Sequence, residues 1–230
     1  MIIQGLQKLT LLDFPGKVAC TVFTAGCNFR CPFCHNASLV IDTHQNPKIP
    51  VEDIFSFLQK RKGVLDGVCV TGGEPLIQHG IGDFLRKIRE MGYLVKLDTN
   101  GSFPDKLQRM VEEGLVDYVA MDLKNSREHY GRTIGIEGYD TGKVEQSVAY
   151  LMKGRIPYEF RTTVVQEFHQ RSDFEAIGQW IRGADRYFLQ QFEDSGDLIR
   201  PGLHAYSDTI MRQALEVVQK YIPAAQVRGL

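Results

Sequence analysis

The 230-residue sequence lacks the features that mark exported and membrane-spanning proteins. Its opening stretch, MIIQGLQKLTLLDFPGK, has neither the basic region nor the long apolar core of a signal peptide. No apolar run approaches the ~20 residues that a membrane-spanning helix needs. An excess of one charge is also absent, because 27 basic and 28 acidic residues give a formal net charge of −1. No global field therefore favours nucleic acid or an anionic membrane, and we expect a cytoplasmic protein that binds neither.

Cysteine is scarce and unevenly placed. Five cysteines is an odd number, and three of them fall between positions 27 and 34, which argues against a disulfide framework. Such crowding is typical of a metal-binding loop in a reducing compartment. The other two, Cys20 and Cys69, lie in the apolar runs VACTVF and GVCVT, so we expect inert buried thiols. Their isolation argues against a second iron–sulfur cluster, which needs several more thiolates.

No repeat, low-complexity tract or linker divides the chain, and short apolar runs alternate with segments of helical period. Alternation of this kind predicts an α/β fold with a parallel sheet, right-handed crossovers and functional loops at the carboxyl ends of the strands. The predicted strands are 18–23, 67–71, 94–98, 117–121, 158–164 and 186–192. The predicted helices carry apolar stripes within 51–58, 81–88, 104–114, 144–152, 172–181 and 210–221, the fifth opening with a capping-box pair, Ser172 and Glu175.

Three cysteines follow the first predicted strand in the stretch GCNFRCPFCHN. Cys27, Cys31 and Cys34 have the spacing Cys-x3-Cys-x2-Cys, and such soft ligands select iron–sulfur clusters, zinc or copper(I). A structural zinc site is normally closed by four ligands, whereas three cysteines on a four-iron cluster leave one iron open to a substrate or cofactor. On spacing alone, a zinc site completed by His35 or by a distant residue, or an incidental group of thiols, remains an alternative.

A glycine-rich turn follows the second predicted strand. Two glycines, Gly72 and Gly73, let the backbone approach a ligand closely. The next residues are Glu74 and Pro75, and a carboxylate beside exposed carbonyls can accept hydrogen bonds from an ammonium group. By itself, this Gly-Gly-Glu-Pro stretch is explained as well by a simple tight turn.

The third and fourth predicted strands end in LDTNG and MDLK. Asp98 and Asp122 come at the ends of these apolar strands, so their carboxylates point into the expected strand-end cleft. Lys124, two residues beyond Asp122, projects to the same side if the chain stays extended. The alternatives are a turn at Asn100 and Gly101, and a solvated salt bridge between the charged residues.

Taken in order, the cysteine loop, GGEP, DTNG and MDLK resemble the signature motifs of the radical S-adenosylmethionine enzymes, and within them the glycyl-radical-enzyme activases. The stretch 11–17, LLDFPGK, running into VFTAGCNFRCPFCHN, is similar to the longer activating proteins of the anaerobic ribonucleoside-triphosphate reductase. The match spans about residues 5–125 and weakens afterwards. The resemblance implies one domain over 1–230, a partial (β/α)6 barrel with its core at about 16–195 and a C-terminal loop and helix at 196–230. Its lateral opening suits a loop of another protein as substrate.

The resemblance also implies the ligands and the residues that hold them. Cys27, Cys31 and Cys34 would bind a [4Fe-4S] cluster whose open iron is chelated by S-adenosylmethionine. The Gly-Gly-Glu-Pro turn and Asp98 would contact the amino end of that cofactor, and Asp122 with Lys124 would lie near its ribose and carboxylate. The aspartates, with Thr99, can also hold a monovalent cation against the cofactor carboxylate. The expected cofactor-binding residues are Gly72, Gly73, Glu74, Pro75, Asp98, Thr99, Asn100, Asp122, Lys124, Arg161 and Gln191.

The second half of the chain departs from the family pattern. Formate-lyase activases have a histidine at the end of the sixth strand, whereas this strand ends FLQQF, so the amide of Gln191 would have to serve. That difference disfavours a formate-lyase activator. Arg161 either points into the barrel toward a carboxylate or forms a structural ion pair. The histidines other than His35 lack any metal-binding spacing, and we expect them to be structural or exposed.

The activity that the resemblance implies is radical chemistry on a partner protein. An electron from a flavodoxin- or ferredoxin-type carrier would reduce the cluster, and S-adenosylmethionine would be cleaved to methionine and a 5′-deoxyadenosyl radical. This radical would take a hydrogen atom from a glycine of the anaerobic ribonucleotide reductase catalytic subunit. No catalytic side chain is expected beyond the cluster and the cofactor. The alternatives are another glycyl-radical enzyme or a small molecule as the target, as in 7-carboxy-7-deazaguanine synthesis, and a non-enzymatic cluster or zinc protein.

Overall fold

The computed structural model describes residues 1–41 and 43–230, which contain eight strands. The chain forms two compact units whose segments interleave along the sequence. The first unit comprises Met1–Asn28, Ser38–Thr99 and Phe103–Ala120, and the second comprises Phe29–Ala37, Asn100–Ser102 and Met121–Leu230. Strand β5 (Tyr118–Asp122) runs from the first unit into the second.

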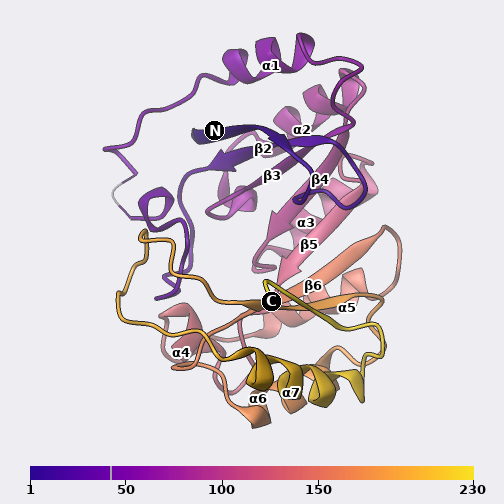
Figure 1. Cartoon of the computed structure of the whole chain (residues 1–230). Coiled ribbons are helices and arrows are strands. Elements are labelled where there is room, and N and C mark those ends of the chain that lie inside the picture. Colours follow the sequence, from indigo (N-terminus) through magenta and orange to yellow (C-terminus); the bar gives the residue numbers. More distant parts are fainter. Residues whose placement is uncertain (42) are drawn as a thin grey trace. The chain divides into compact units, whose positions relative to one another are not determined.

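The first unit is built on parallel strands in chain order, with one antiparallel strand at its edge (Figure 1). Strand β1 is antiparallel to β2, whereas β2, β3 and β4 are parallel. The strands are β1 (Ile3–Thr10), β2 (Ala19–Thr24), β3 (Gly67–Gly72) and β4 (Leu94–Thr99), followed by the start of β5. The helices are α1 (Val51–Gln59), α2 (Ile81–Glu90) and α3 (Pro104–Glu112), with the 3-10 turn η2 (Pro75–Ile77); the 3-10 turn η1 (Ala37–Leu39) begins at the unit boundary.

Burial explains why these segments take these forms. Every residue of β2 except Phe23 is buried, as expected for a strand covered on both faces. In α2 the buried residues are Ile81, Phe84, Leu85 and Ile88, which form one helical stripe. Parallel strands end at the same edge of a sheet, so the carboxyl ends of β2, β3 and β4 lie at one edge of this unit.

The second unit continues with parallel strands in chain order. The end of β5 lies beside β6 (Tyr158–Val164), because the Leu123 amide donates to the Arg161 carbonyl at 2.8 Å. Strands β7 (Tyr187–Gln191) and β8 (Gln226–Arg228) follow, and helices α6 (Arg171–Trp180) and α7 (Asp208–Gln219) lie side by side (Figure 1). The remaining helices are α4 (Tyr130–Ile134) and α5 (Gly142–Leu151).

All six predicted strands are confirmed as β2 to β7, and the six predicted helices as α1, α2, α3, α5, α6 and α7. The sequence did not predict β1, β8 or α4. The predicted capping box was wrong: α6 is capped two residues earlier, by Gln170 and Asp173 instead of Ser172 and Glu175. Within the described residues, none of the helices has the length and apolarity that crossing a membrane requires.

Candidate functional site

The loop that carries the first cysteine leaves β2 alongside the Gly-Gly-Glu-Pro turn. The Gly73 amide donates to the Thr24 carbonyl at 2.8 Å, and the Glu74 amide donates to the Gly26 carbonyl at 2.9 Å. A Cβ on Gly73 would lie only 1.9 Å from the Gly26 oxygen, and Gly72 has a φ of +114°. Only glycine permits this approach, so the first unit builds the two motifs as one piece of backbone.

The Glu74 side chain is fully buried, with 0% of its surface exposed. Its Oε1 accepts hydrogen bonds from the Leu76 amide at 3.0 Å and from the Thr99 hydroxyl at 2.9 Å. The carboxylate thus caps η2 and joins the Gly-Gly-Glu-Pro turn to the Asp-Thr-Asn-Gly motif. Two predicted site residues, Glu74 and Thr99, are therefore brought together, and both have a clear role in shaping the turn.

Asp98 lies at the end of β4 with its side chain 13% exposed and forms an ion pair with Lys96. Lys96 is 1% exposed, and Cys69 faces it across the parallel β3–β4 pair. The Cys69 thiol lies 3.7 Å from Asp98 Oδ1. The expectation that Cys69 is buried is confirmed, but its contact with Asp98 was not foreseen. Sequence reasoning also missed Lys96, although a lysine inside a buried strand, two residues before an aspartate, was a usable signal.

In the second unit, Cys31 and Cys34 share one tight turn. The Cys34 amide donates to the Cys31 carbonyl at 3.0 Å. The turn is fixed through Arg30, whose amide donates to the Ile134 carbonyl at 2.9 Å. Gly135 packs so closely there that a Cβ would lie 2.5 Å from the Arg30 oxygen. Both thiols are therefore held on a backbone that is already shaped.

The aromatic residues between the cysteines anchor this turn. Phe29 is 2% exposed and packs edge-on against Tyr130 and Tyr139. Phe33 is 3% exposed and packs against Phe168, with ring centroids 5.7 Å apart. The Cys-x3-Cys-x2-Cys stretch thus alternates ligand candidates with buried anchors. His35, the residue after the last cysteine, stacks on Phe192 with ring centroids 5.5 Å apart.

Asp122, Lys124 and Arg161 form an ion triplet where the end of β5 lies beside the middle of β6. Lys124 Nζ lies 2.9 Å from one carboxylate oxygen of Asp122, and Arg161 Nε lies 2.9 Å from the other. Burial disfavours the ionised carboxylate, but the Arg161 guanidinium and the Lys124 ammonium outweigh it and hold the pKa of Asp122 well below its usual range. The prediction that Lys124 projects beside Asp122 is confirmed. Of the two options for Arg161, the structure shows the ion pair with a neighbouring acid.

The Lys124 ammonium also acts on the two cysteines of its unit. Burial favours the neutral amine, but Asp122 and, after it, Cys31 outweigh burial and raise the pKa of Lys124. Burial raises the pKa of the Cys34 thiol, and the Lys124 charge opposes that rise. A fixed cation near thiols favours the thiolate, which is the form that binds metals.

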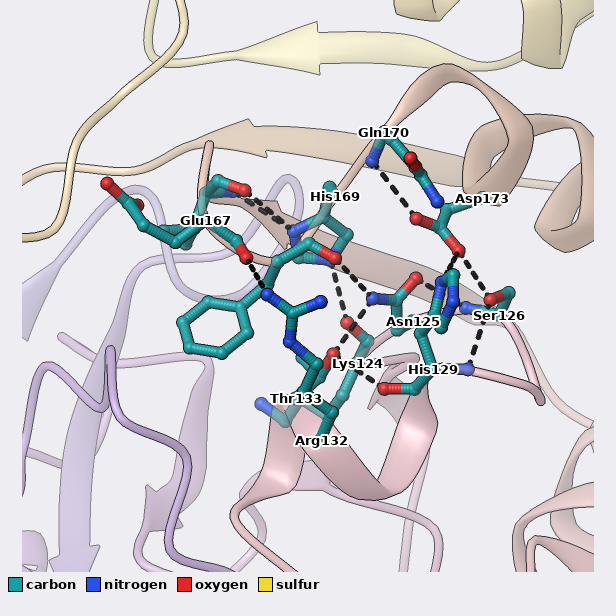
Figure 2. Close-up of polar contacts among 12 residues, drawn as sticks. Lys124, Asn125, Ser126, His129, Arg132, Thr133, Glu167, His169, Gln170 and Asp173 are labelled. Carbon is teal, nitrogen blue, oxygen red and sulfur yellow. Dashed lines mark hydrogen bonds and ion pairs between the residues drawn. The ribbon is translucent and has the colours of Figure 1, made fainter. Parts of the chain in front are cut away.

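The loop after Lys124 is clamped by buried polar groups (Figure 2). His169 is 1% exposed, and its Nε2 lies 2.8 Å from the Lys124 carbonyl. Its Nδ1 accepts a hydrogen bond from the Val165 amide at 3.1 Å, so the ring is neutral with the proton on Nε2. The Asn125 side-chain amide donates to the Phe168 carbonyl at 2.8 Å. These bonds fix the direction in which the Lys124 side chain leaves the backbone.

Asp173 is a second hub of the same clamp and is 2% exposed. Its Oδ1 accepts from the Ser126 hydroxyl at 2.5 Å and from His129 Nδ1 at 2.7 Å, and its Oδ2 accepts from the Gln170 amide at 3.0 Å (Figure 2). The same carboxylate therefore caps α6 and ties it to the loop after β5. This demand on Asp173 explains why the cap lies two residues before the predicted pair.

Two further predicted residues use their amides within the second unit. Asn100 Oδ1 accepts from the Ser102 amide at 3.0 Å, the local turn that Asn-Gly favours. Gln191 Nε2 donates to the Tyr206 carbonyl at 2.8 Å.

The donor chemistry fits an iron–sulfur cluster. Cys27 and Cys34 are half-buried and Cys31 is buried, and all five cysteines are free of disulfides. In the part of the chain that the structure describes, no three His, Cys, Asp or Glu side chains are gathered as a ready-made metal site. The assignment of the cysteines therefore rests on three thiols, their spacing, the shaped turn and the cation beside it.

Comparison with known proteins identifies relatives over the whole chain. The model of the Radical SAM superfamily matches residues 21–181. A putative glycyl-radical enzyme activating enzyme of Methanocaldococcus jannaschii is 29% identical over 235 residues, covering 100% of this chain and 96% of the relative. The pyruvate formate-lyase-activating enzyme of Staphylococcus aureus is 25% identical over 205 residues (83% and 78%). A 7-carboxy-7-deazaguanine synthase of Hyperthermus butylicus is 34% identical over 92 residues (40% and 38%).

Solved structures agree on the fold. Streptococcus suis SuiB bound to S-adenosylmethionine matches with a TM-score of 0.68 at 14% identity, over 90% of this chain and 49% of that one. Escherichia coli QueE matches with a TM-score of 0.57 at 14% identity, over 100% of this chain and 94% of that one. The predicted fold class, an α/β partial barrel, is confirmed.

Proposed function

Since this chain belongs to the Radical SAM superfamily, we propose that it generates a glycyl radical on a partner enzyme, the anaerobic ribonucleoside-triphosphate reductase. The observation that carries the proposal is the end-to-end similarity to a putative glycyl-radical enzyme activating enzyme. The partner is supported by the LLDFPGK stretch before the cysteine loop and by the glutamine that replaces the histidine of formate-lyase activases. A flavodoxin- or ferredoxin-type carrier would supply the electron.

In this proposal, Cys27, Cys31 and Cys34 hold a [4Fe-4S] cluster and S-adenosylmethionine binds beside it. When bound, these two groups supply one-electron cleavage of a carbon–sulfur bond and removal of a hydrogen atom from glycine. The chain's own task is to shape the cysteine loop. Phe29 and Phe33 fix the turn, and Lys124 offsets the negative charge of the thiolates.

The polar motifs have separate tasks in orienting S-adenosylmethionine. The Gly72–Glu74 backbone, which Glu74 and Thr99 hold in place, presents carbonyl groups to the ammonium of the ligand. Asp122 remains ionised because Arg161 and Lys124 hold it, and an ionised carboxylate accepts hydrogen bonds from ribose hydroxyls. No side chain has to accept or donate a proton in this reaction.

A second candidate function is synthesis of 7-carboxy-7-deazaguanine. It is favoured by the 34% identity to one such synthase, although that match covers only 40% of this chain. A small-molecule substrate would need a pocket with its own set of ligands, whereas a glycyl-radical enzyme brings its glycine on a loop.

The deciding experiment is anaerobic electron paramagnetic resonance on the reconstituted protein with reductant, S-adenosylmethionine and the anaerobic reductase. We expect a glycyl-radical doublet on the reductase that disappears when S-adenosylmethionine is omitted. Formation of 5′-deoxyadenosine without the doublet would reject this partner. In a separate incubation, the substrate of the 7-carboxy-7-deazaguanine synthases is supplied in place of the reductase. Release of 7-carboxy-7-deazaguanine there, detected by mass spectrometry, would support the second function.

Cysteine variants test the cluster separately. Replacing Cys31 with serine should abolish stable cluster loading, measured as bound iron and sulfide after reconstitution. Cys20 provides the control because it is also buried but lies within β2, so Cys20→Ala should still load. Zinc in place of iron, bound with the same cysteine dependence, would reject the radical mechanism.

A further inference from the structure

The first unit contains a buried ammonium group for which the proposed chemistry has no task. Lys96 is among the largest fully buried side chains of the protein and lies within β4. Its Nζ forms an ion pair with Asp98 Oδ1 and lies 3.8 Å from the Cys69 sulfur, which is itself 3.7 Å from the same carboxylate oxygen. Lysine, aspartate and thiol thus form one closed cluster.

The geometry of strands β3 and β4 brings the three side chains of this cluster to one face of the sheet. Residues two apart on a strand share a face, so Lys96 and Asp98 point the same way. The β3–β4 register places Cys69 directly opposite Lys96. Burying an ammonium is unfavourable unless a counter-charge accompanies it, and Asp98 is that counter-charge. Packing alone does not require a lysine at position 96, because methionine would fill the same volume in an apolar strand at no electrostatic cost. We therefore attribute the lysine to its pairing with Asp98.

The family resemblance implies a second aspartate, Asp122, as a ligand for a monovalent cation. This carboxylate is also neutralised by residues of the chain itself. In the second unit Asp122 pairs with Lys124 and Arg161, both at 2.9 Å. Each carboxylate thus has at least one cation from its own unit. A small hard cation needs oxygen ligands whose negative charge is available, and a fixed ammonium on the same carboxylate repels it. The residues present do not fit an additional sodium or potassium ion.

We propose that the Lys96 ammonium takes the place of a dissociable monovalent cation at Asp98, so that this chain binds S-adenosylmethionine without one. The inference rests on the proposed S-adenosylmethionine site and adds Lys96 to it as a positioning residue. The Lys96 ammonium is part of the chain and cannot dissociate, so it neutralises and orients the Asp98 carboxylate at every salt concentration.

The test is the response of cofactor binding to small cations. Reconstituted wild type and Lys96→Met are prepared in tetramethylammonium chloride, whose cation is too large to replace a lysine ammonium. Potassium, sodium or ammonium is then exchanged in at constant ionic strength. The dissociation constant of S-adenosylmethionine is measured by equilibrium dialysis, and the thermal unfolding midpoint is measured in the same buffers.

We expect wild type to bind S-adenosylmethionine equally well with and without small cations. Lys96→Met should bind at least about tenfold more weakly in tetramethylammonium, because Asp98 then lacks its counter-charge. Millimolar potassium or ammonium should restore much of that loss, and Lys96→Arg should need no rescue. Lys87→Met removes an exposed lysine of α2 that pairs with Glu90, and it should behave as wild type throughout.

Three results would overturn the inference. The first is wild-type binding that requires potassium or sodium, which decides the matter even if Lys96→Met does not fold. The second is a Lys96→Met protein that folds normally but that no small cation rescues, because Lys96 would then be structural only. The third, absence of S-adenosylmethionine binding by wild type in every buffer, would overturn the proposed function as well, so the two failures are distinguishable.

Discussion

Replacing Gly73 with alanine should separate the Gly-Gly-Glu-Pro turn from the cysteine loop. The new Cβ would lie 1.9 Å from the Gly26 oxygen and 2.6 Å from its carbon, and both are backbone atoms that cannot rotate away. The backbone must therefore shift. It would lose the bonds from Gly73 to Thr24 and from Glu74 to Gly26, each with a net value of about 1 kcal/mol. With about 1–3 kcal/mol for the forced displacement, the expected loss is about 3–5 kcal/mol of unfolding free energy.

Urea unfolding of the cluster-free protein, followed by circular dichroism, measures this loss. Iron content after reconstitution shows whether the cysteine loop has moved. Gly82→Ala in α2 is the matched control, because its Cβ meets only the flexible Met110 side chain, at 3.4 Å. Alanine suits a helix better than glycine, so the control should gain up to about 1 kcal/mol. A Gly73→Ala protein with wild-type stability and wild-type iron content would refute the close approach of the two motifs.

Three further predictions concern the second unit. Asp122→Asn leaves two partly buried cations, Lys124 and Arg161, without their carboxylate and should cost about 3 kcal/mol at pH 7 in urea unfolding. Because the folded-state pKa of Asp122 is depressed, this difference should persist above about pH 4 and shrink below it, and a constant difference would contradict the pairing. Burial lowers the pKa of His169, so the unfolded chain gains this proton at a higher pH than the folded protein does. Cluster-free wild type should therefore lose stability as the pH falls from 7 to 5, and it should do so more steeply than His169→Gln. Asp173→Asn should cost about 1–3 kcal/mol, whereas Ser172→Ala should stay within about 0.5 kcal/mol; a loss of about 1 kcal/mol for Ser172→Ala would instead support the cap predicted from sequence.

The sequence predicted the six central strands because each contains short apolar stretches and most of its residues are buried. It did not predict β1, since IQGLQKLT mixes polar and apolar residues without alternation, and most of the strand is partly exposed at the sheet edge. Strand β8 has only three residues, too few for any period to be visible. The capping box of α6 was misplaced because tertiary contacts determine its position. Asp173 also accepts hydrogen bonds from Ser126 and His129, and no local sequence pattern indicates these contacts.

The candidate site was predictable where chemistry follows local spacing. The pairing of Asp122 with Lys124 follows from two-residue spacing in an extended segment, and the structure bears it out. The partner of Asp98 obeys the same rule but was overlooked, because a lysine within an apolar run is easily taken as an exception to a buried strand. The burial of Glu74 could not be predicted, since it depends on Thr99 of the next strand and on a turn that glycine alone allows.

The motif residues therefore divide by how their polar atoms are used. Glu74 and Asn100 bond to neighbouring backbone, so substituting them should first change the shape of the turns. Asp98 and Asp122 are paired with cations that the chain supplies, so substituting either leaves a buried or partly buried positive charge without its partner, in addition to removing a negative charge. Loss of function in an aspartate variant is thus not evidence of direct ligand contact by itself. The informative comparison is with a variant that lacks the paired cation, such as Lys96→Met. If the carboxylate acts on the ligand, this variant should bind S-adenosylmethionine more weakly, and an added small cation should restore the binding.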